Sequence, residues 1–575
     1  MAVHNKEIAD ILTRVADLLE IDGENAFRVR SYRQASRTIA EHPESLEKLY
    51  RDGKDLTALP DIGESIAEKI AEIVKTGKLD QLEKIEKRVP GGLADLLGIE
   101  QLGPQRVKSL YNELDIRNTK DLKKAAENGE ISKIKGFGKK TEESILEEIG
   151  KAEEGIAGRR FKWAEAEELI QSLLEYLEKN DHISTLLPAG SFRRSKETVG
   201  DIDILAIGDD PESIMKSFTS FDEVKKIVSK GKTRSTVILR SGLQVDLRLV
   251  EEESYGAAMH YFTGSKDHNV AVRKIAQSKG YKLNEYGVFE GDRRRGGSTE
   301  EEVFEMMGLR WIEPELRENR GEIDAARKGK LPQLITLEDI RGDLQSHTDN
   351  TDGKYSLKEM VNAAKGKGYD YCAVTDHSKR VTMAKGLDEK RLRGLMEKID
   401  ALNESMKGFR ILKGIEVDIL EDGSLDLSDD VLSQLDVVVF SVHYNRNLSE
   451  KKQTERIIRA MDNRYVNIFA HPTGRLIGER EPYAVDLEKV MKAALERGVF
   501  LEVNAHPDRL DLSDIHIKRA KELGLKVAIS TDAHSTGNLF NMRHGVAQAR
   551  RGWLEADDVI NTRTWRDLKK LLKRS

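Results

Sequence analysis

Two aspartates separated by a single apolar residue constrain the fold of this chain more than any other feature. Residues 189–194 read Ala-Gly-Ser-Phe-Arg-Arg, and Asp201-Ile202-Asp203 follows shortly after. Side chains two apart on a strand point to the same face, so Asp201 and Asp203 would share one face while Ile202 packs behind them. Residues 243–249 alternate in the same way and carry Asp246 and Arg248 on their polar face. We expect these two strands to be neighbours in one sheet.

Three carboxylates on adjacent strands suit divalent cations that hold a triphosphate. Carboxylate oxygens are the ligands that Mg²⁺ prefers, and Gly190 with Ser191 would let backbone and hydroxyl donors approach phosphate oxygens. The chemistry would be nucleotidyl transfer, in which the nucleophile and the leaving group lie in line across a phosphorus atom. An isolated Asp-x-Asp is common at solvated strand edges, but its place after a Gly-Ser turn and a pair of arginines favours a site.

Length and composition limit the remaining possibilities. A chain of 575 residues exceeds what one hydrophobic core supports, so we expect several domains. The net charge of −6 gives no overall attraction to nucleic acid, so any such binding must come from local basic patches and backbone donors. The single cysteine, Cys372, excludes an internal disulfide and suits a reducing compartment. The N-terminus lacks a signal-like apolar core, and no run approaches about eighteen apolar residues, so we expect a cytoplasmic protein without a membrane segment.

Three glycine turns recur in the first third of the chain. Gly63, Gly103 and Gly138 each follow an apolar residue and precede a segment with helical periodicity. This pattern resembles the helix-hairpin-helix motif, in which backbone N–H groups at a helix N-terminus meet a DNA phosphate without reading sequence. The alternative is three ordinary turns between helices. An earlier helical segment, about residues 5–50, carries Tyr32 among arginines; this side chain suits either a DNA end or the core.

Residues 1 to about 315 are similar to family X DNA polymerases of the DNA polymerase beta type. The motifs at 190–194, 200–203, 245–248 and 261–265 fall in the order and spacing of that family. The resemblance implies two α-helical domains at 1–88 and 89–155, the second with two hairpins, an α+β palm at 156–255 and a thumb at 256–316.

The same resemblance implies roles for individual residues. Asp201, Asp203 and Asp246 would be catalytic and carry Mg²⁺, or Mn²⁺, with Asp246 closest to the primer 3′ hydroxyl. Arg273 would contact the template. Apart from this resemblance, we also expect Arg248, Tyr32 and the hairpin glycines to contact DNA. The nucleotide would be bound by Gly190, Ser191, Arg194, Gly200, Tyr261, Phe262, Gly264, Lys266 and Asn269. Lys266 stands where the vertebrate family is usually acidic, and we expect this cation to tighten nucleotide binding.

Lys69 falls where the family has its Schiff-base lysine, in Ile66-Ala67-Glu68-Lys69. Such an amine would attack the sugar aldehyde of a 5′-deoxyribose phosphate. Ser65 occupies a position that is basic in the vertebrate enzyme, so the supporting charge is weaker here. The resemblance therefore leaves this lyase activity open.

The second half of the chain follows a different pattern. Residues 317–336 are charged and helical, with Pro332 near the end, and are expected to form a linker. Beyond them, apolar strands alternate with helices, and acidic residues and histidines follow successive strands. In a parallel barrel these positions meet on the carboxyl-end face. A lone histidine is usually structural, but a series at strand ends indicates a metal site, and histidines with carboxylates suit Zn²⁺ or Mn²⁺.

Four motifs resemble the polymerase and histidinol phosphatase (PHP) domain, a phosphoesterase with up to three ions on a distorted (β/α)₇ barrel. They are Asp343-Leu344-Gln345-Ser346-His347, Thr375-Asp376-His377, Gly414-Ile415-Glu416 and Thr531-Asp532-Ala533-His534. The resemblance covers residues 337–575. It implies a metal-ligand set of Gln345, His347, Asp352, His377, Glu416, His443, His471, Asp532 and His534, with Glu416 bridging. Gln345 stands where the family often has histidine, so one metal position would be weaker.

Both halves together resemble the bacterial and archaeal family X polymerases that carry a PHP domain. This architecture implies gap filling in base excision repair, with a 3′-5′ exonuclease and cleavage at abasic sites or 3′ phosphodiesters. The partners would be gapped or nicked DNA, deoxynucleoside triphosphates and other repair proteins, and we expect a monomer. Two alternatives remain open: a small-substrate nucleotidyltransferase fused to a small-molecule phosphatase, and a non-catalytic scaffold for DNA ends. The repeated hairpins argue against the first, and the full set of carboxylates argues against the second.

Overall fold

The computed structural model describes residues 3, 5–40, 42, 46–99, 102–153 and 159–572. The chain divides into two compact units, Met1–Arg159 and Arg160–Ser575. In the part of the chain that the structure describes, none of the helices has the length and apolar character needed to cross a membrane.

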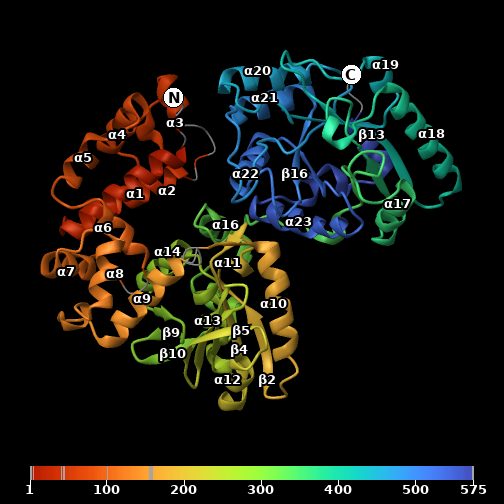
Figure 1. The fold of residues 1–575 in the computed structure, drawn as a ribbon. Helices are drawn as coiled ribbons and strands as arrows, with labels where there is room; N and C mark the ends of the chain where they lie inside the picture. The colour runs from red at the N-terminus through yellow and green to blue at the C-terminus, as the bar shows by residue number, and fades with distance from the viewer. Residues whose placement is uncertain are drawn as a thin grey trace. The chain divides into compact units, whose positions relative to one another are not determined.

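In the described residues of the first unit, all secondary-structure elements are helices. This unit appears in red to orange in Figure 1. Helix α1 lies at its centre and packs against α2, α5, α6 and α7. Leu12, Val15 and Leu19 of α1 are fully buried, at the three- and four-residue spacing of an amphipathic helix. The helices are α1 Asn5–Asp22, α2 Ala26–Ala40, α3 Leu46–Arg51, α4 Glu64–Thr76, α5 Asp80–Glu86, α6 Gly92–Asp95, α7 Pro104–Leu114, α8 Thr119–Glu127 and α9 Lys139–Glu153.

The three glycine turns of this unit have the predicted form. Helices α4, α7 and α9 begin directly after Gly63, Gly103 and Gly138. The helical hairpins predicted from the sequence are therefore confirmed as structure.

The second unit begins with a five-stranded sheet in the order β2-β4-β7-β6-β5. Strands β4 and β7 are parallel neighbours, and Asp203 lies opposite Asp246 in their register. Helices α10 and α12 cover the face that buries Ile202 and Ile204, and α13 packs on the other face. The elements are β2 Ile183–Pro188, β4 Asp201–Gly208, β5 Val224–Lys230, β6 Arg234–Leu239, β7 Gln244–Leu249, α10 Trp163–Leu177, α11 Gly190–Arg193, α12 Pro211–Thr219, α13 Tyr255–Thr263 and the small β1–β3 pair, Phe161–Lys162 with Thr198–Val199.

A smaller helical layer follows, with its own apolar core around Phe304 and Val272. It contains a three-stranded sheet in the order β10-β9-β8. Its elements are α14 Lys266–Ser278, β8 Lys282–Asn284, β9 Gly287–Glu290, β10 Arg293–Gly296, α15 Glu300–Met306 and α16 Glu322–Lys328.

The rest of the unit is a barrel of seven parallel strands, β11 to β17 in chain order. An isolated parallel bridge between Ser346 and Ala533 joins the segments after β11 and β17, so the barrel is nearly closed. Figure 1 shows it in green to blue. Its strands are β11 Gly342–Asp343, β12 Tyr371–Val374, β13 Arg410–Asp418, β14 Val437–Ser441, β15 Ile468–Phe469, β16 Phe500–Asn504 and β17 Val527–Ser530. Its helices are α17 Leu357–Gly366, α18 Glu389–Ser405, α19 Asp429–Leu432, α20 Glu450–Met461, α21 Leu487–Arg497, α22 Asp514–Leu523, α23 Met542–Arg551 and α24 Trp565–Leu572.

Residues 317–336, the segment expected to form a linker, contain buried charged side chains. Arg317 is fully buried, and its guanidinium pairs with Glu300 at 2.5 Å and donates to the Ile312 carbonyl oxygen. Glu322 is also buried and lies 2.8 Å from His268 Nδ1. Charged side chains can be buried when each is paired, so this segment packs as an integral part of the second unit.

Candidate active sites

The carboxylates of the sheet meet as the alternation predicted. Asp201 and Asp203 extend from β4, and Asp246 extends from β7, while Ile202 is only 1% exposed behind them. Thr236 Oγ1 donates to Asp246 Oδ1 at 2.5 Å, and Gln244 Nε2 donates to Asp246 Oδ2 at 3.1 Å. These bonds orient Asp246.

The electrostatics of this cluster fit a cation site. Burial, together with the charges of Asp201 and Asp246, raises the pKa of Asp203 to about 6. Burial and Asp246 also raise the pKa of Asp201. Both shifts express the same unfavourable energy, that of like charges held together away from water, and a divalent cation would relieve it. Two arginines compensate part of this charge: Arg234 Nη2 lies 3.2 Å from Asp246 Oδ1, and Arg248 Nε lies 3.7 Å from Asp203 Oδ1.

The Gly-Ser turn approaches these carboxylates closely. Gly190 has φ +64, a conformation that favours glycine, and a Cβ atom there would lie 3.4 Å from Asp203 Oδ2. Arg194 follows the turn, and its side chain bonds to Glu318 Oε1 at 3.1 Å and to the Thr263 carbonyl oxygen. The guanidinium predicted to hold a triphosphate is thus bound to protein acceptors.

The remaining predicted nucleotide residues gather around the end of α13. Tyr261, Asn269 and Arg273 line one small pocket, together with His260, Leu283 and Asn284. Asn269 is buried and donates to the Tyr261 carbonyl oxygen at 2.7 Å. The guanidinium of Arg248 lies 4.4 Å from the ring centre of Phe262. The other predicted positions are Gly264, with φ +70, Gly200 directly before β4, half-buried Ser191, and exposed Lys266 in the first turn of α14.

In the first unit, the amine of Lys69 is partly buried and bonded to the protein. Its Nζ donates to the carbonyl oxygen and to Oγ of Ser65, both at 2.8 Å. Burial and the nearby charge of Arg28 lower the pKa of Lys69. A lowered pKa increases the fraction of neutral, nucleophilic amine at neutral pH.

Tyr32, predicted to bind DNA, requires a correction. Its ring is only 3% exposed, and its hydroxyl donates to Gln81 Oε1 at 2.7 Å. It faces the helical core because it follows the buried Val29 by three residues on α2. Tyr32 therefore supports the surface near Lys69, which lies 6.0 Å from its ring, and presents no stacking face.

The hairpin glycines are open to an external partner. Gly63 and Gly103 have φ −84 and −78, which any residue adopts. A Cβ atom at Gly63, Gly103 or Gly138 would meet no atom within 4 Å. Neither backbone strain nor internal packing in the described residues requires glycine at these positions, which is consistent with close approach of an external backbone.

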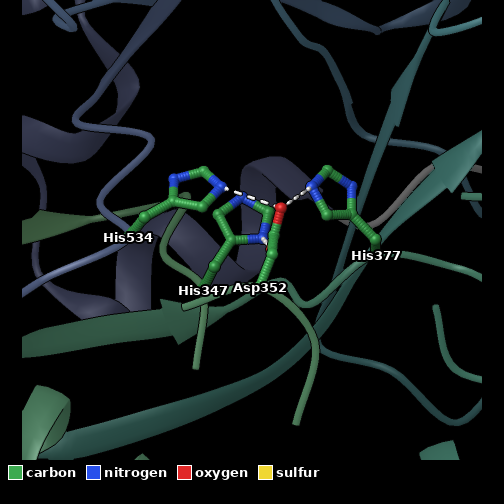
Figure 2. A group of neighbouring side chains, drawn as sticks. All are labelled: His347, Asp352, His377 and His534. Atoms are coloured by element: carbon green, nitrogen blue, oxygen red, sulfur yellow. Dashed lines mark ion pairs between the residues drawn. The ribbon is translucent and has the colours of Figure 1, made fainter. Parts of the chain in front are cut away.

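The barrel brings its predicted ligands together at the carboxyl ends of the strands. Figure 2 shows Asp352 between His377 and His534, with His347 beside it. Asp352 Oδ2 lies 3.4 Å from His377 Nε2 and 3.5 Å from His534 Nε2. His347 Nε2 lies 3.1 Å from Asp532 Oδ1. The four side chains in Figure 2 offer ligand atoms that lie close enough together for one ion to contact several of them. The same is true of two neighbouring groups of three side chains, which share Glu416.

Glu416 lies at the centre of the cluster. His377 Nδ1 is 3.2 Å from one carboxylate oxygen, and His471 Nε2 is 3.1 Å from the other. His443 Nε2 is 3.4 Å away from the same oxygen as His471. Burial alone would raise the pKa of Glu416, but these histidines hold it well below its usual range. Glu416 sits within β13 and not after its end, a small correction that leaves its side chain on the same rim.

Several buried atoms of this cluster lack hydrogen-bond partners among the described residues. They include His347 Nδ1, His377 Nδ1 and Glu416 Oε2, and both amide atoms of Gln345. Unpaired buried polar atoms are costly, and nitrogen and oxygen donors converging in this way fit metal ions. Gln345 is fully buried, so its amide oxygen is available for the same role.

Asp532 and Asp352 raise the pKa of His534 to about 9, against the opposing effect of burial. A metal ion bound by His534 would displace a proton from this imidazole.

Sequence reasoning missed the residues that orient these ligands. Asp418 is fully buried, accepts from the backbone N–H of His443 and lies 3.2 Å from His443 Nδ1. Glu502 accepts from the backbone N–H of His471 at 2.7 Å. Asp418 lies two residues after Glu416 on the same strand face, so the alternation of a strand could have identified it from the sequence. Glu502 is linked to His471 only by the barrel fold.

Together, a palm-like sheet with clustered carboxylates and a barrel with a histidine-rich rim define a nucleotidyltransferase joined to a metal-dependent phosphoesterase. Comparison with known families gives the same division. Models described as DNA polymerase beta palm and thumb match residues 160–273 and 258–318, and the PHP domain matches 343–506. A helix-hairpin-helix domain matches 3–79, and a SAM-like helix-hairpin-helix tandem matches 93–151.

Individual relatives extend the similarity over the full chain. The chain is 38% identical to the DNA polymerase/3′-5′ exonuclease PolX of Bacillus subtilis (strain 168), over 100% of both proteins. A probable phosphatase of Thermoanaerobacter sp. (strain X514) is 31% identical over 38% of this chain and 89% of its own length. DNA polymerase lambda of Arabidopsis thaliana is 28% identical over 54% of this chain and 62% of its own length. The chain belongs to the bacterial family X DNA polymerases that carry a PHP domain.

Proposed function

We propose that this chain is a DNA-directed DNA polymerase that fills short gaps during base excision repair, and that its barrel is a 3′-5′ exonuclease. The observation that carries the polymerase assignment is the register of β4 and β7, in which Asp203 lies opposite Asp246 beside the Gly190 turn. The family relationship supports both activities. We further propose the division into domains at 1–88, 89–155, 156–255, 256–316, 317–336 and 337–575, with 317–336 packed as described above.

In the palm, Asp201, Asp203 and Asp246 would hold Mg²⁺ or Mn²⁺. When bound, these ions neutralise charge on the nucleophile and on the leaving pyrophosphate. Thr236 and Gln244 keep Asp246 in one orientation, which keeps the primer end aligned. Gly190 and Ser191 would donate to the triphosphate, and Arg194 would exchange its bond to Glu318 for one to phosphate. Tyr261, Phe262, Gly264, Lys266 and Asn269 would surround the nucleotide, and Arg248 and Arg273 would contact DNA.

In the barrel, the ligand set around Glu416 would hold up to three Mn²⁺ or Zn²⁺ ions. Such ions make water a good nucleophile near neutral pH. Asp418 and Glu502 orient His443 and the His471 segment, so the donor atoms converge before substrate arrives. Gln345 would supply an amide oxygen. We propose that abasic sites and blocked 3′ ends are further substrates of this rim.

The two active sites can be separated experimentally. On a gapped duplex, Asp203→Ala should abolish primer extension and leave 3′ degradation, whereas His377→Ala should abolish degradation and leave extension. Asp222→Ala, at an exposed position of the palm, serves as the control. Loss of both activities in either variant would contradict two independent sites. Loss of neither would contradict the assignment of the residues.

Lys69 supports a second activity, a 5′-deoxyribose phosphate lyase. The observation that favours it is the lowered pKa of an amine that contacts Ser65 on the side facing Tyr32. We also propose that the chain acts in the cytoplasm as a monomer on gapped or nicked DNA, with deoxynucleoside triphosphates as co-substrates and other repair proteins as partners.

A further inference from the structure

Three arginines gather beside the rim of the barrel, from three different loops. Arg446 follows β14, Arg480 lies between β15 and α21, and Arg509 follows β16. Gly474 lies among them: Arg480 Nε donates to its carbonyl oxygen at 2.9 Å, and a Cβ atom at Gly474 would lie 3.9 Å from Arg446 Cδ. Arg509 Nε lies 3.4 Å from Asp532 Oδ2. The cluster therefore adjoins the proposed metal ligands on one side.

The positive charges of this cluster are poorly compensated. Among the described residues, neither Arg446 nor Arg480 forms an ion pair with a carboxylate. Burial and the charges of Arg446 and Arg509 lower the pKa of Arg480 to about 10. The charges of Glu479 and Asp511 offset only part of this repulsion, and Asp511 Oδ2 also accepts from the backbone N–H groups of Thr473 and Gly474. Like charges held together in this way are typical of an anion site.

Lys162 of the palm pairs with two carboxylates that flank the cluster. Glu479 and Asp508 directly precede Arg480 and Arg509 in the sequence. Both bind Lys162 instead, with its Nζ 2.9 Å from Glu479 Oε1 and 2.5 Å from Asp508 Oδ1. A residue of the polymerase part thus offsets some of the negative charge beside the arginines of the barrel.

We propose that Arg446, Arg480 and Arg509 bind a phosphodiester of a single-stranded nucleic acid, next to the one that is hydrolysed. The proposal rests on the proposed nuclease function and specifies its substrate. Arg509 reaches Asp532, whereas no bond of Arg446 or Arg480 to a proposed metal ligand occurs in the described residues. We therefore assign the neighbouring phosphate to Arg446 and Arg480, which lie beside Arg509. Guanidinium groups match phosphate oxygens in pairs, which favours this ligand.

The proposal distinguishes a polynucleotide from a substrate with one phosphate. The first test compares kcat/KM on single-stranded oligothymidylate with kcat/KM on thymidine 5′-(p-nitrophenyl phosphate), which has a single phosphodiester. Arg446→Ala and Arg480→Ala should each lower the ratio of the two values roughly tenfold. Arg480→Lys should lower this ratio less than Arg480→Ala does. The control is Arg464→Ala, an exposed arginine that stacks on Tyr465. An equal loss on both substrates, or no loss on the oligonucleotide, would overturn the proposal.

A second test does not depend on catalysis. In EDTA, the affinity of the full chain for a fluorescent thymidine trinucleotide should fall in Arg446→Ala and Arg480→Ala, and its salt dependence should become shallower by about 0.7 per arginine. The wild-type chain could hydrolyse neither substrate while the two arginine variants still lose affinity for the trinucleotide. In that case the nuclease proposal fails and the phosphate site remains. If affinity and salt dependence match those of Arg464→Ala, the phosphate site is refuted.

Lys162 gives a third, independent measurement. Lys162→Ala would release Glu479 and Asp508 to pair with the arginines, so trinucleotide affinity should fall although no arginine has changed. Lys162→Arg should preserve affinity. Thermal unfolding of both variants reports whether the fold is intact. Unchanged affinity in a folded Lys162→Ala variant would contradict the proposed effect of the palm on this site.

Discussion

Arg551 of the barrel helix α23 donates a hydrogen bond of 2.7 Å to the carbonyl oxygen of Arg194, the residue that ends the Gly-Ser turn of the palm. The two guanidinium groups also share Glu318, which lies 3.2 Å from Arg551 Nη1 and 3.1 Å from Arg194 Nε. Asp514 pairs with the other nitrogen of Arg551 at 2.6 Å. The barrel therefore supports, through a buried charge network, the turn that is proposed to bind the triphosphate.

Arg551→Ala should weaken both stability and nucleotide binding. It leaves the carboxylates of Asp514 and Glu318 with fewer partners, and removal of one member of a buried ion pair destabilises by about 3–5 kcal/mol. We expect a lower Tm and a raised KM for deoxynucleoside triphosphate, with a smaller change in kcat, because the turn is displaced and the carboxylates of β4 are not. Arg551→Lys should recover part of both. A normal KM in a folded Arg551→Ala variant would show that the network does not position the turn.

Asp203 predicts how metal binding and stability depend on pH. Its pKa of about 6 lies above the usual value of 3.8, so between these pH values the folded chain binds more protons than the unfolded chain. In EDTA, stability should therefore fall as pH rises through this window. Asp203→Asn should raise the stability of the metal-free second unit at pH 7.5 by ~1–3 kcal/mol, while Mg²⁺ no longer stabilises it. Calorimetry with and without Mg²⁺ measures both effects, with Asp222→Asn as control. A lower Tm in metal-free Asp203→Asn would contradict the unfavourable charge cluster.

Gln345 predicts a weak metal position in the barrel. Gln345→His should increase the number of Mn²⁺ ions retained after dialysis, because imidazole is a stronger ligand than an amide oxygen. Gln345→Ala should reduce it. Elemental analysis after dialysis against limiting chelator counts the ions. Equal metal content in the native chain and Gln345→Ala would exclude Gln345 as a ligand.

Lys69 predicts a trapped covalent adduct. Borohydride should link the chain to DNA with a 5′-deoxyribose phosphate, and Lys69→Ala should lose at least about nine-tenths of the product, since the amine that forms the Schiff base is removed. The yield should rise with pH as Lys69 loses its proton, and the rise should begin below the usual range for lysine because its pKa is lowered. Lys75→Ala on the same helix is the control. Equal trapping in Lys69→Ala would assign the chemistry to another amine.

Local sequence patterns were sufficient to predict the position of a side chain where that position depends only on the residue spacing within one strand. The alternation around Asp203 and Asp246 placed both on polar strand faces, and the pairing of β4 with β7 confirmed that they are neighbours. The order of histidines and acidic residues after successive strands predicted the rim of the barrel. In both cases side-chain direction is fixed by the strand itself, so no knowledge of distant contacts was needed.

The same reasoning was wrong where a side chain has two possible environments. Tyr32 lies among arginines in the sequence, as a DNA-binding aromatic residue would, but its side chain packs in the core. Residues 317–336 have the charge of a solvated linker, but Arg317 and Glu322 are buried with partners. Those partners, Glu300 and His268, lie on other helices, and a pattern within one segment cannot identify them.

By itself, the sequence predicted the classes of domain, the candidate carboxylates and histidines for metal binding, and the motifs shared with known families, because these depend on the spacing of residues within single strands and turns. Only the tertiary structure decided which charges neutralise one another. Lys162 draws Glu479 and Asp508 away from their neighbouring arginines, and Arg551 reaches Arg194 across more than 350 residues of chain. Electrostatic interactions depend on distance in space and on burial, and neither quantity is contained in the order of residues along the chain.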